Sequence, residues 1–387
     1  MKPALLRTIY VAYRSGMARD KPSSDTPLKR GWTTGACATA ATKAALTALI
    51  TAEFPDPVTI TLPKGETPAF PLCYESLNEA GASAGIVKDA GDDPDVTHGA
   101  TIISTVRPLP EGSGVVFCAG EGVGMVTKAG LPIPPGEPAI NPVPRQMMRD
   151  VVAELCGDHL MSPDLEITIS VPDGAAMAEK TWNGRLGIVG GLSILGTTGI
   201  VHPFSCAAWI HSIHRGIDVA REAGYERVIA ATGSTSEDAA QRIYELPETA
   251  LLDMGDFAGG LLKYLRVHPV PAITLAGGFA KFTKLAQGAL DLHSGRSQVD
   301  FMWLAGRVDR LIEDMPSLAM KKIIRDQILG ANTAAEVLTM AQSMEIDLPK
   351  DVAREALTIV KGILRGAAVD VEVLIVDRQG EVIARER

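Results

Sequence analysis

The sequence predicts an α+β N-terminal domain followed by an α/β domain with a parallel sheet (βαβαβα), helical segments and a C-terminal hairpin. Up to residue 202, short β-branched segments alternate with Gly- and Pro-rich turns, which is typical of an α+β domain. From residue 203, strand and helix patterns alternate, which indicates a parallel sheet covered by helices. We therefore expect a loosely ordered extension at 1–27, an α+β domain at 28–202 and an α/β domain at 203–387.

Composition limits the class of protein. The chain has 387 residues with a net charge of −9, which argues against general nucleic-acid binding. Its five cysteines form no C-x-x-C pair, so neither a disulfide framework nor a zinc ribbon is indicated. Arg7 and Arg14 interrupt the apolar runs near the N-terminus, and no later stretch approaches the roughly 18 apolar residues of a membrane span. These features predict a soluble cytoplasmic protein.

The N-terminal domain contains four predicted strands and two predicted helices. The strands are expected at 57–62, 99–106, 114–118 and 165–171, and the second helix at 142–160. The first helix follows "GWTTG" at Gly31–Gly35, where Thr34 is the expected cap. The free amides at this helix start could instead face an anion, so both interpretations stay open.

The C-terminal domain begins with an amphipathic helix predicted at 203–224. Strands are expected at 227–233, 249–255 and 271–278, and helices at 234–245, 257–266 and 280–290. The segment 369–386 predicts a hairpin that turns at 378–380.

Two glycine patterns could mark a nucleotide site. Gly120, Gly122 and Gly124 follow a strand, but prolines replace the helix that a dinucleotide fingerprint requires, so we reject that interpretation. A tight loop that lines a ligand and plain turn geometry both stay open for these glycines. The second pattern is stronger, because the residues that could bind a cofactor follow three parallel strands: Gly233, Ser234, Asp253, Gly277 and Gly278. Ser/Thr and Glu at 234–237 also fit a capping arrangement, and ordinary caps and turns are the alternative for the whole set.

An acidic segment lies between Lys88 and His98. Its four aspartates, at 89, 92, 93 and 95, lack the spacing of a calcium loop, and a solvated turn is the simplest interpretation. A bound cation, such as a sulfonium, or a raised pKa would relieve their mutual repulsion. His211 and His214 lie one helical turn apart without an evident further ligand, so we predict no metal site.

Several of these segments together resemble the CbiD family of cobalt-precorrin-5B C1-methyltransferases. The matching segments are "RGWTTGACATAATKAA", "VKDAGDDPDVTHGA", "GEGVGMVTKAGLPIPPGEPAINPVPRQM" and "RLGIVGGLSILGTTGIVHPFS", with a weaker match at "GGFAKFTKLAQG". The chain departs from the family pattern at 231–235, at 253–256 and at His202, which puts the cofactor contacts and any role of His202 in question.

The resemblance implies transfer of a methyl group from S-adenosylmethionine to carbon 1 of a ring-contracted tetrapyrrole in cobalamin biosynthesis. Asp92 or Asp93 would steer the sulfonium or accept a proton, and seven residues would bind the substrate: Thr33, Thr34, Lys88, Lys128, Arg145, Thr197 and Thr198. The four threonines could instead bind the methionine carboxylate of the donor. The basic residues among them, with Lys29, Arg30, Lys64 and Arg185, are expected to line one cleft for the substrate carboxylates.

Two other functions stay open at this point. A non-catalytic corrinoid or tetrapyrrole carrier would need the basic cleft but no donor site. A nucleotide-dependent oxidoreductase would use the second domain alone. The tetrapyrrole is the expected partner; we expect no nucleic acid and no membrane, and a homo-oligomer is left open.

Overall fold

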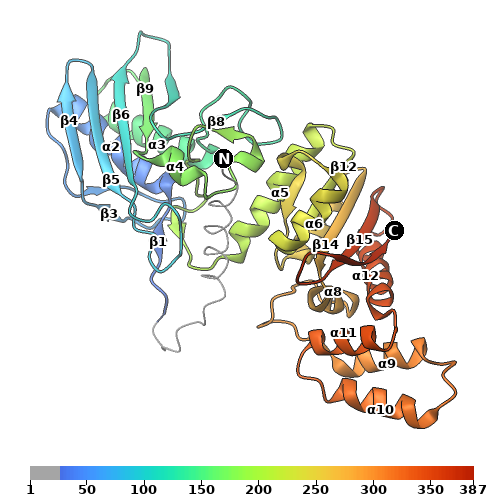
Figure 1. Ribbon diagram of the computed structural model, residues 1–387. Helices are drawn as coiled ribbons and strands as arrows, with labels where there is room; N and C mark the ends of the chain where they lie inside the picture. Colours follow the sequence, from blue (N-terminus) through green and yellow to red (C-terminus); the bar gives the residue numbers. More distant parts are fainter. Residues whose placement is uncertain (1–26) are drawn as a thin grey trace. The chain divides into compact units, whose positions relative to one another are not determined.

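The computed structural model describes residues 27–387, which divide into two compact units (Figure 1). The first unit ends at Cys206 and the second spans Ala207–Arg387. The extension expected at 1–27 lies outside the described residues, except for Pro27. Within the described part, no helix combines the length and the apolar character needed to cross a membrane.

The first unit is built on a mostly antiparallel five-stranded sheet of order β4-β5-β6-β9-β7. Only β7 and β9 run parallel to each other. The strands are β4 (Tyr74–Asn78), β5 (Gly81–Val87), β6 (Thr101–Pro108), β7 (Val115–Ala119) and β9 (Leu165–Ser170). The predicted strands at 99–106, 114–118 and 165–171 are confirmed as β6, β7 and β9, whereas β4 and β5 were not predicted.

Small side chains explain why β5 escaped prediction. Helix α2 (Thr34–Thr51) packs against β5 and β6, and nearly all of its buried residues are small, seven of the thirteen being alanine. Ala82 and Ala84 of β5 are fully buried in the same hydrophobic core. The close approach of helix and strand requires alanine and glycine in place of the β-branched residues that normally reveal a strand.

The remaining elements of this unit surround the sheet. Helix α3 (Pro142–Asp158) packs beside α2 and begins with prolines at its first turn, as predicted. Three short antiparallel pairs are β1 (Gly31–Trp32) with β11 (Ile200–Val201), β2 (Val58–Thr59) with β3 (Ala69–Phe70), and β8 (Met125–Val126) with β10 (Ile188–Val189). The shortest helical pieces are α4 (Gly174–Ala178) and η1 (Gly184–Leu186).

The second unit contains a five-stranded sheet of order β13-β12-β14-β15-β16. Its strands are β12 (Arg227–Ala231), β13 (Leu251–Asp253), β14 (Ala272–Gly278), β15 (Asp370–Val376) and β16 (Val382–Glu386). The first four are parallel, which confirms the predicted βαβαβα order, and β15 and β16 form the predicted antiparallel hairpin. The chain leaves β12 toward β13 on one side and later adds β14 on its other side, so β12 and β14 flank a topological switch point.

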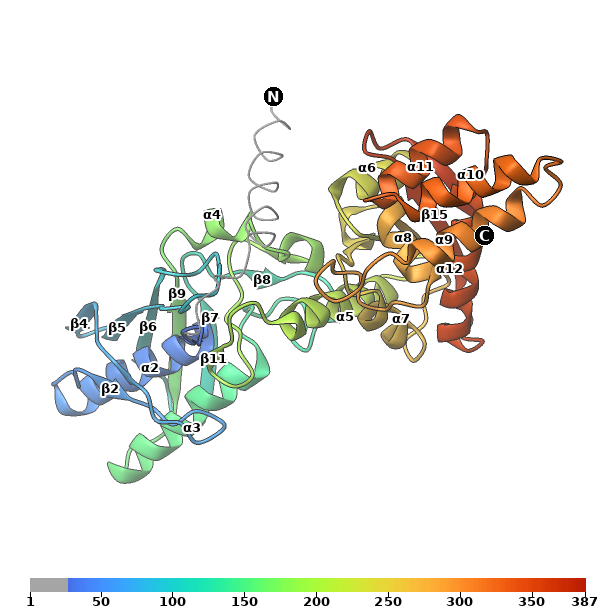
Figure 2. The same cartoon turned by 90° about the horizontal axis from the view of Figure 1, so that it is seen from below.

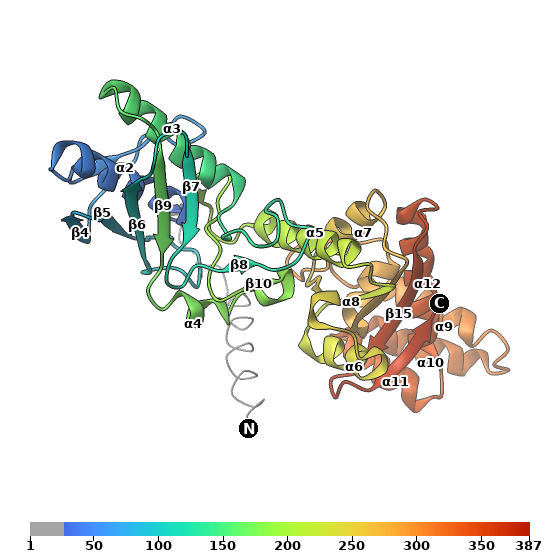
Figure 3. The same cartoon turned by 90° about the horizontal axis from the view of Figure 1, so that it is seen from above.

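Helices cover both faces of this sheet (Figures 2 and 3). Helix α6 (Ser234–Tyr244) packs on one face against Ile229 and Leu374. The main core lies on the other face and involves α5 (Cys206–Glu222), α7 (Ala258–Leu265), α8 (Phe279–Ala286) and α12 (Leu348–Leu364). Helices α9 (Phe301–Leu311), α10 (Leu318–Leu329) and α11 (Ala334–Ser343) extend this layer, and η2 (Glu248–Ala250) precedes β13.

Candidate functional site

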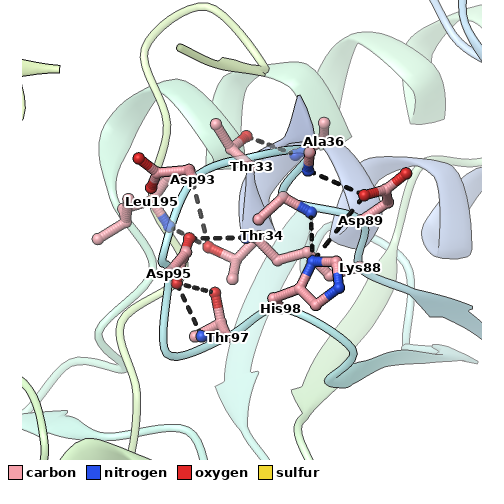
Figure 4. Close-up of polar contacts among 12 residues, drawn as sticks. Thr33, Thr34, Ala36, Lys88, Asp89, Asp93, Asp95, Thr97, His98 and Leu195 are labelled. Carbon is pink, nitrogen blue, oxygen red and sulfur yellow. Dashed lines mark hydrogen bonds and ion pairs between the residues drawn. The ribbon is translucent and has the colours of Figure 1, made fainter. Parts of the chain in front are cut away.

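The acidic segment is the connection between β5 and β6, and a buried ion pair organises it (Figure 4). Lys88 is only 1% exposed, and its Nζ lies 2.7 Å from Oδ2 of Asp95. The amide and the hydroxyl of Thr97 both donate to Oδ1 of Asp95. Burial alone would raise the pKa of Asp95, but Lys88 and the Thr97 donors outweigh it, so the pKa lies below its usual value.

Two further aspartates of this loop interact with Lys29. The ammonium of Lys29 lies 2.6 Å from Oδ2 of Asp89, and the backbone amide of Lys29 donates to Oδ2 of Asp92. The hydrogen bond from Lys29 and one from the amide of Gly91 lower the pKa of Asp89. Lys29 and Lys88 therefore offset part of the expected repulsion, at Asp89, Asp92 and Asp95.

Asp93 differs from Asp89 and Asp95. It is half-buried, and its Oδ1 accepts a hydrogen bond of 2.8 Å from the backbone amide of Phe204. Burial raises the pKa of Asp93 more than this amide and Lys88 lower it, and Asp95 adds to the rise. A carboxyl group with a raised pKa in a polar loop is a candidate for proton transfer.

The hydroxyl-rich turn uses its donors within the protein. Thr33, not Thr34, caps α2, because its hydroxyl accepts from the amide of Ala36; the predicted cap was wrong. Thr34 exchanges hydrogen bonds with the backbone of Leu195, and the amide of Gly35 donates to the Leu195 carbonyl. Both threonines are buried. The turn therefore joins α2 to the segment around Leu195. The amides of Gly35 and Ala36 already have partners within the protein, so they are not open to an anion.

The second threonine pair lies beside this turn. An added Cβ at Gly196 would come within 2.3 Å of the Thr33 hydroxyl, so the two segments touch only because Gly196 lacks a side chain. Thr198 is half-buried and bonds within its own turn, where the amide of Ile200 donates to its hydroxyl. Thr197 is exposed and is the residue of this pair that a ligand could reach.

Three of the basic residues that are expected to line one cleft have partners within the protein. The guanidinium of Arg145 has three partners within the protein. Its Nη1 pairs with the carboxylate of Glu137, and its Nε and Nη2 donate to the carbonyls of Ile140 and Pro138. Lys88 and Lys29 are paired with aspartates, as described above. Arg145 thus holds the proline-rich loop onto α3, and its binding of substrate stays a prediction. Lys128 packs against Gly187, where an added Cβ would lie 2.7 Å from its side chain.

The glycines at 120, 122 and 124 serve close packing. An added Cβ at Gly120 would lie 2.0 Å from the Ser170 hydroxyl, and one at Gly122 would lie 2.0 Å from the carbonyl of Val171. Gly122 also has a φ of +69°, which favours glycine. These contacts agree with rejecting a dinucleotide fingerprint here.

The cofactor residues predicted in the second unit gather at the carboxyl edge of the parallel sheet. Gly233 precedes α6 and Gly278 ends β14, on the two sides of the switch point. Gly233 is the N-cap residue of α6 and provides no side-chain cap, and the hydroxyl of Ser236 donates to the Gly233 carbonyl. A Cβ added at Gly277 would collide with Phe282 and Thr232, whereas one at Gly278 would meet nothing within 4 Å.

Two acidic residues lie at this edge, the predicted Asp253 at the end of β13 and Asp256 in the turn that follows. Asp253 is only 3% exposed, so its carboxylate is poorly placed for the ribose contact that its spacing predicts. Asp256, three residues later, is more exposed and lies 3.1 Å from Nζ of Lys281, which also donates to the Thr232 carbonyl. Sequence reasoning missed Asp256 and Lys281, because their pairing depends on the turn after β13.

The histidine pair on α5 has structural partners. The ring of His214 stacks on Tyr264 with centroids 4.0 Å apart, and its Nε2 lies 3.2 Å from the Gly260 carbonyl. His211 is exposed. Over residues 27–387, no group of three or more His, Cys, Asp or Glu side chains is arranged to hold a metal ion.

Comparisons with known proteins define the family. Residues 21–203 match the family model CbiD, and residues 291–387 match the model of the CbiD C-terminal domain. A Brucella anthropi protein is 64% identical over 368 residues, covering 95% of this chain and 98% of the relative. A Brucella abortus protein is 65% identical over 360 residues, covering 92% and 95%. Both are named cobalt-precorrin-5B C(1)-methyltransferase. The chain belongs to the CbiD family.

One solved structure is also similar, a cobalamin biosynthesis protein (cbiD) from Archaeoglobus fulgidus. It is 28% identical, and the match covers 70% of this chain and 83% of that chain with a TM-score of 0.38.

Proposed function

We propose that this chain transfers a methyl group from S-adenosylmethionine to carbon 1 of cobalt-precorrin-5B in cobalamin biosynthesis. The observation that carries the proposal is the 64% identity to a relative of that name over 95% of the chain. The N-terminal match contains the acidic loop and the hydroxyl-rich turn. The reaction takes place in the cytoplasm, and any cobalt belongs to the substrate.

S-adenosylmethionine would supply an activated methyl group: the substrate carbon would attack the methyl carbon opposite its bond to sulfur, and S-adenosylhomocysteine would leave with the electron pair of that bond. We place its site at the carboxyl edge of the second unit's sheet, where ligands of open parallel sheets bind. The start of α6 at Gly233 and Ser234 has no side-chain cap, and the backbone at Gly278 is open to close approach. These features fit a ligand that carries a carboxylate. Asp256 replaces Asp253 as the acidic residue we assign to this site.

We place the tetrapyrrole at the acidic loop of the first unit. Asp92 and Asp93 are the candidate catalytic carboxylates, and Asp93 is favoured because its pKa is raised while it remains half-buried. Thr197 and Lys128 are the substrate-binding candidates that we retain. Thr33, Thr34, Lys88 and Arg145 are assigned instead to shaping the site, since each is committed to a partner within the protein.

The first test is calorimetric titration of the purified protein with S-adenosylhomocysteine, with NADPH as the control. Saturable binding of S-adenosylhomocysteine alone is the expected result. It would be followed by turnover of cobalt-precorrin-5B with methyl-labelled donor, read as label incorporated at carbon 1. Binding of NADPH alone would favour an oxidoreductase and contradict the proposal. Tetrapyrrole binding without any methyl transfer would identify a carrier.

A further inference from the structure

One aromatic residue of the first unit has an unusual backbone conformation. Phe204 has a φ of +57°, in the left-handed region that bulky residues avoid. Among the described non-glycine residues with positive φ, five lie at or just beyond helix C-terminal ends, where this conformation is common: Ala52, Leu160, Glu245, Glu345 and Arg365. Asp173 and Phe204 instead lie just before a helix, Phe204 in the turn at 203–204, where glycine or asparagine is the usual residue at a positive φ.

The strained residue is held by the acidic loop. Its backbone amide donates to Oδ1 of Asp93, 111 positions earlier in the sequence, over 2.8 Å. The carboxylate of Asp93 is half-buried and is therefore partly removed from water. The hydrogen bond therefore holds the backbone of Phe204, and with it the starting point of its side chain, in one position.

Phe204 as a residue remains 43% exposed. Three features around this hydrogen bond are therefore unfavourable in free energy: the positive φ of Phe204, the partial desolvation of the Asp93 carboxylate and the exposure of an aromatic residue to water. Strained residues are retained only where the surrounding structure holds them in place, and they are found most often at active sites and ligand-binding sites. The proposed substrate is a flat conjugated macrocycle, whose faces are matched by an aromatic side chain.

We propose that Phe204 is a substrate-binding residue whose ring contacts a face of the tetrapyrrole, and that Asp93 is the positioning residue that holds it there. This inference rests on the proposed function. It assigns Asp93 a second task, independent of any proton transfer. Removal of the ring should therefore weaken tetrapyrrole binding and leave donor binding unaffected.

The test compares Phe204→Gly with Phe204→Tyr. Glycine removes the ring and also relieves the backbone strain, so the melting temperature should stay the same or rise. The KM for the tetrapyrrole should nevertheless increase roughly tenfold, with the KM for S-adenosylmethionine unchanged. Tyrosine keeps the ring and should recover most of the loss. Leu160→Gly is the matched control, since Leu160 also has a positive φ and is exposed on α3's C-terminal side; it should leave both KM values unchanged.

The role of Asp93 is tested by two further variants. Asp93→Ala removes the acceptor and should raise the KM for the tetrapyrrole as Phe204→Gly does. Asp93→Asn keeps an oxygen acceptor and should restore that KM, whatever happens to kcat. An unchanged KM in Phe204→Gly or in Asp93→Ala would overturn the inference.

A binding experiment separates this inference from the proposed function. The intact protein is titrated with dicyanocobyrinic acid, a corrin that carries free carboxylates, and the quenching of protein fluorescence is followed. Weaker quenching in Phe204→Gly than in the wild type supports the inference even if no methyl transfer is detected. Equal dissociation constants for the two proteins would contradict it, even in an active methyltransferase.

Discussion

At the scale of single residues, the pair Lys88–Asp95 decides whether the acidic loop keeps its shape. Asp95→Asn would leave a 1% exposed ammonium without a charged partner. We expect a loss of about 3 kcal/mol in the free energy of unfolding of the first unit. Lys88→Met removes the buried charge itself and should cost less. Urea denaturation and hydrogen exchange over residues 88–100 would measure both variants, and equal losses would contradict this reasoning.

The same pair gives a pH dependence of known sign. The pKa of Asp95 is lowered by folding, so its contribution is complete above the unfolded value of about 3.9 and is lost as pH falls through the lower folded value. The stability difference between wild type and Asp95→Asn should therefore be constant from about pH 5 to 7 and shrink below about pH 4. A difference that grows in acid would show that another group controls the loop.

Cysteine reactivity provides a second test of burial at this scale. Burial raises the pKa of Cys37 to about 12, whereas Cys73 and Cys206 are exposed. Because the thiolate is the nucleophile, iodoacetamide at about pH 8 should modify Cys73 and Cys206 and spare Cys37. Peptide mass spectrometry measures the modification, and a sample in urea should show all three modified. Equal rates for Cys37 and Cys206 in the folded protein would contradict the burial of α2.

The sequence identifies the segments of the candidate site better than its contacting residues. Thr33, Arg145 and Lys88 belong to motifs that resemble the family, yet each is committed to partners within the protein. Their partners lie within eight positions in the sequence, but the pairing depends on how the turns fold. Other contacts of the site are distant in the sequence, since Leu195 lies 161 positions from Thr34 and Asp93 lies 111 from Phe204. Long-range hydrogen bonds decide which donors remain for a ligand.

At the scale of elements, periodic and β-branched segments were predictable and the alanine-rich ones were not. The strands β12, β13 and β14 and the helices between them were recognised because Val, Ile and Leu cluster in the strands and α6 is amphipathic. Strand β5, "GASAGIV", lacks that signal, since α2 packs closely on it. Its assignment as a strand depends on a partner that is distant in the sequence.

The close packing of α2 on β5 predicts the effect of enlarging one residue. Ala84 is fully buried in this core, so Ala84→Leu should cost about 1–3 kcal/mol in the free energy of unfolding by overpacking. Val87→Leu, at the exposed end of the same strand, is the control and should change stability by less than about 0.5 kcal/mol. Urea unfolding followed by circular dichroism would compare them, and a tolerated Ala84→Leu would mean that α2 can move away from the sheet.

At the scale of the whole molecule, two hydrophobic cores are separate. One runs from Ala36 to Ile194 and the other from Ile213 to Ala384, with no shared residue. The second unit also closes its sheet with its own C-terminus, since Arg385 of β16 pairs with the fully buried Glu372 of β15. A unit that buries its own apolar side chains and satisfies its own buried charges has what an independently folding domain requires.

Separate expression of residues 1–206 and 207–387 tests this organisation together with the proposed donor site. Each fragment should unfold cooperatively in urea, because each retains a complete core. Calorimetry with S-adenosylhomocysteine should detect binding to 207–387 with a dissociation constant within about tenfold of the intact chain, and none to 1–206. A folded 207–387 fragment that fails to bind, while the intact chain binds, would contradict the placement of the donor at the carboxyl edge of β12 and β14. Binding by 1–206 alone would move the donor site to the first unit, where the acidic loop offers carboxylates that could face a sulfonium.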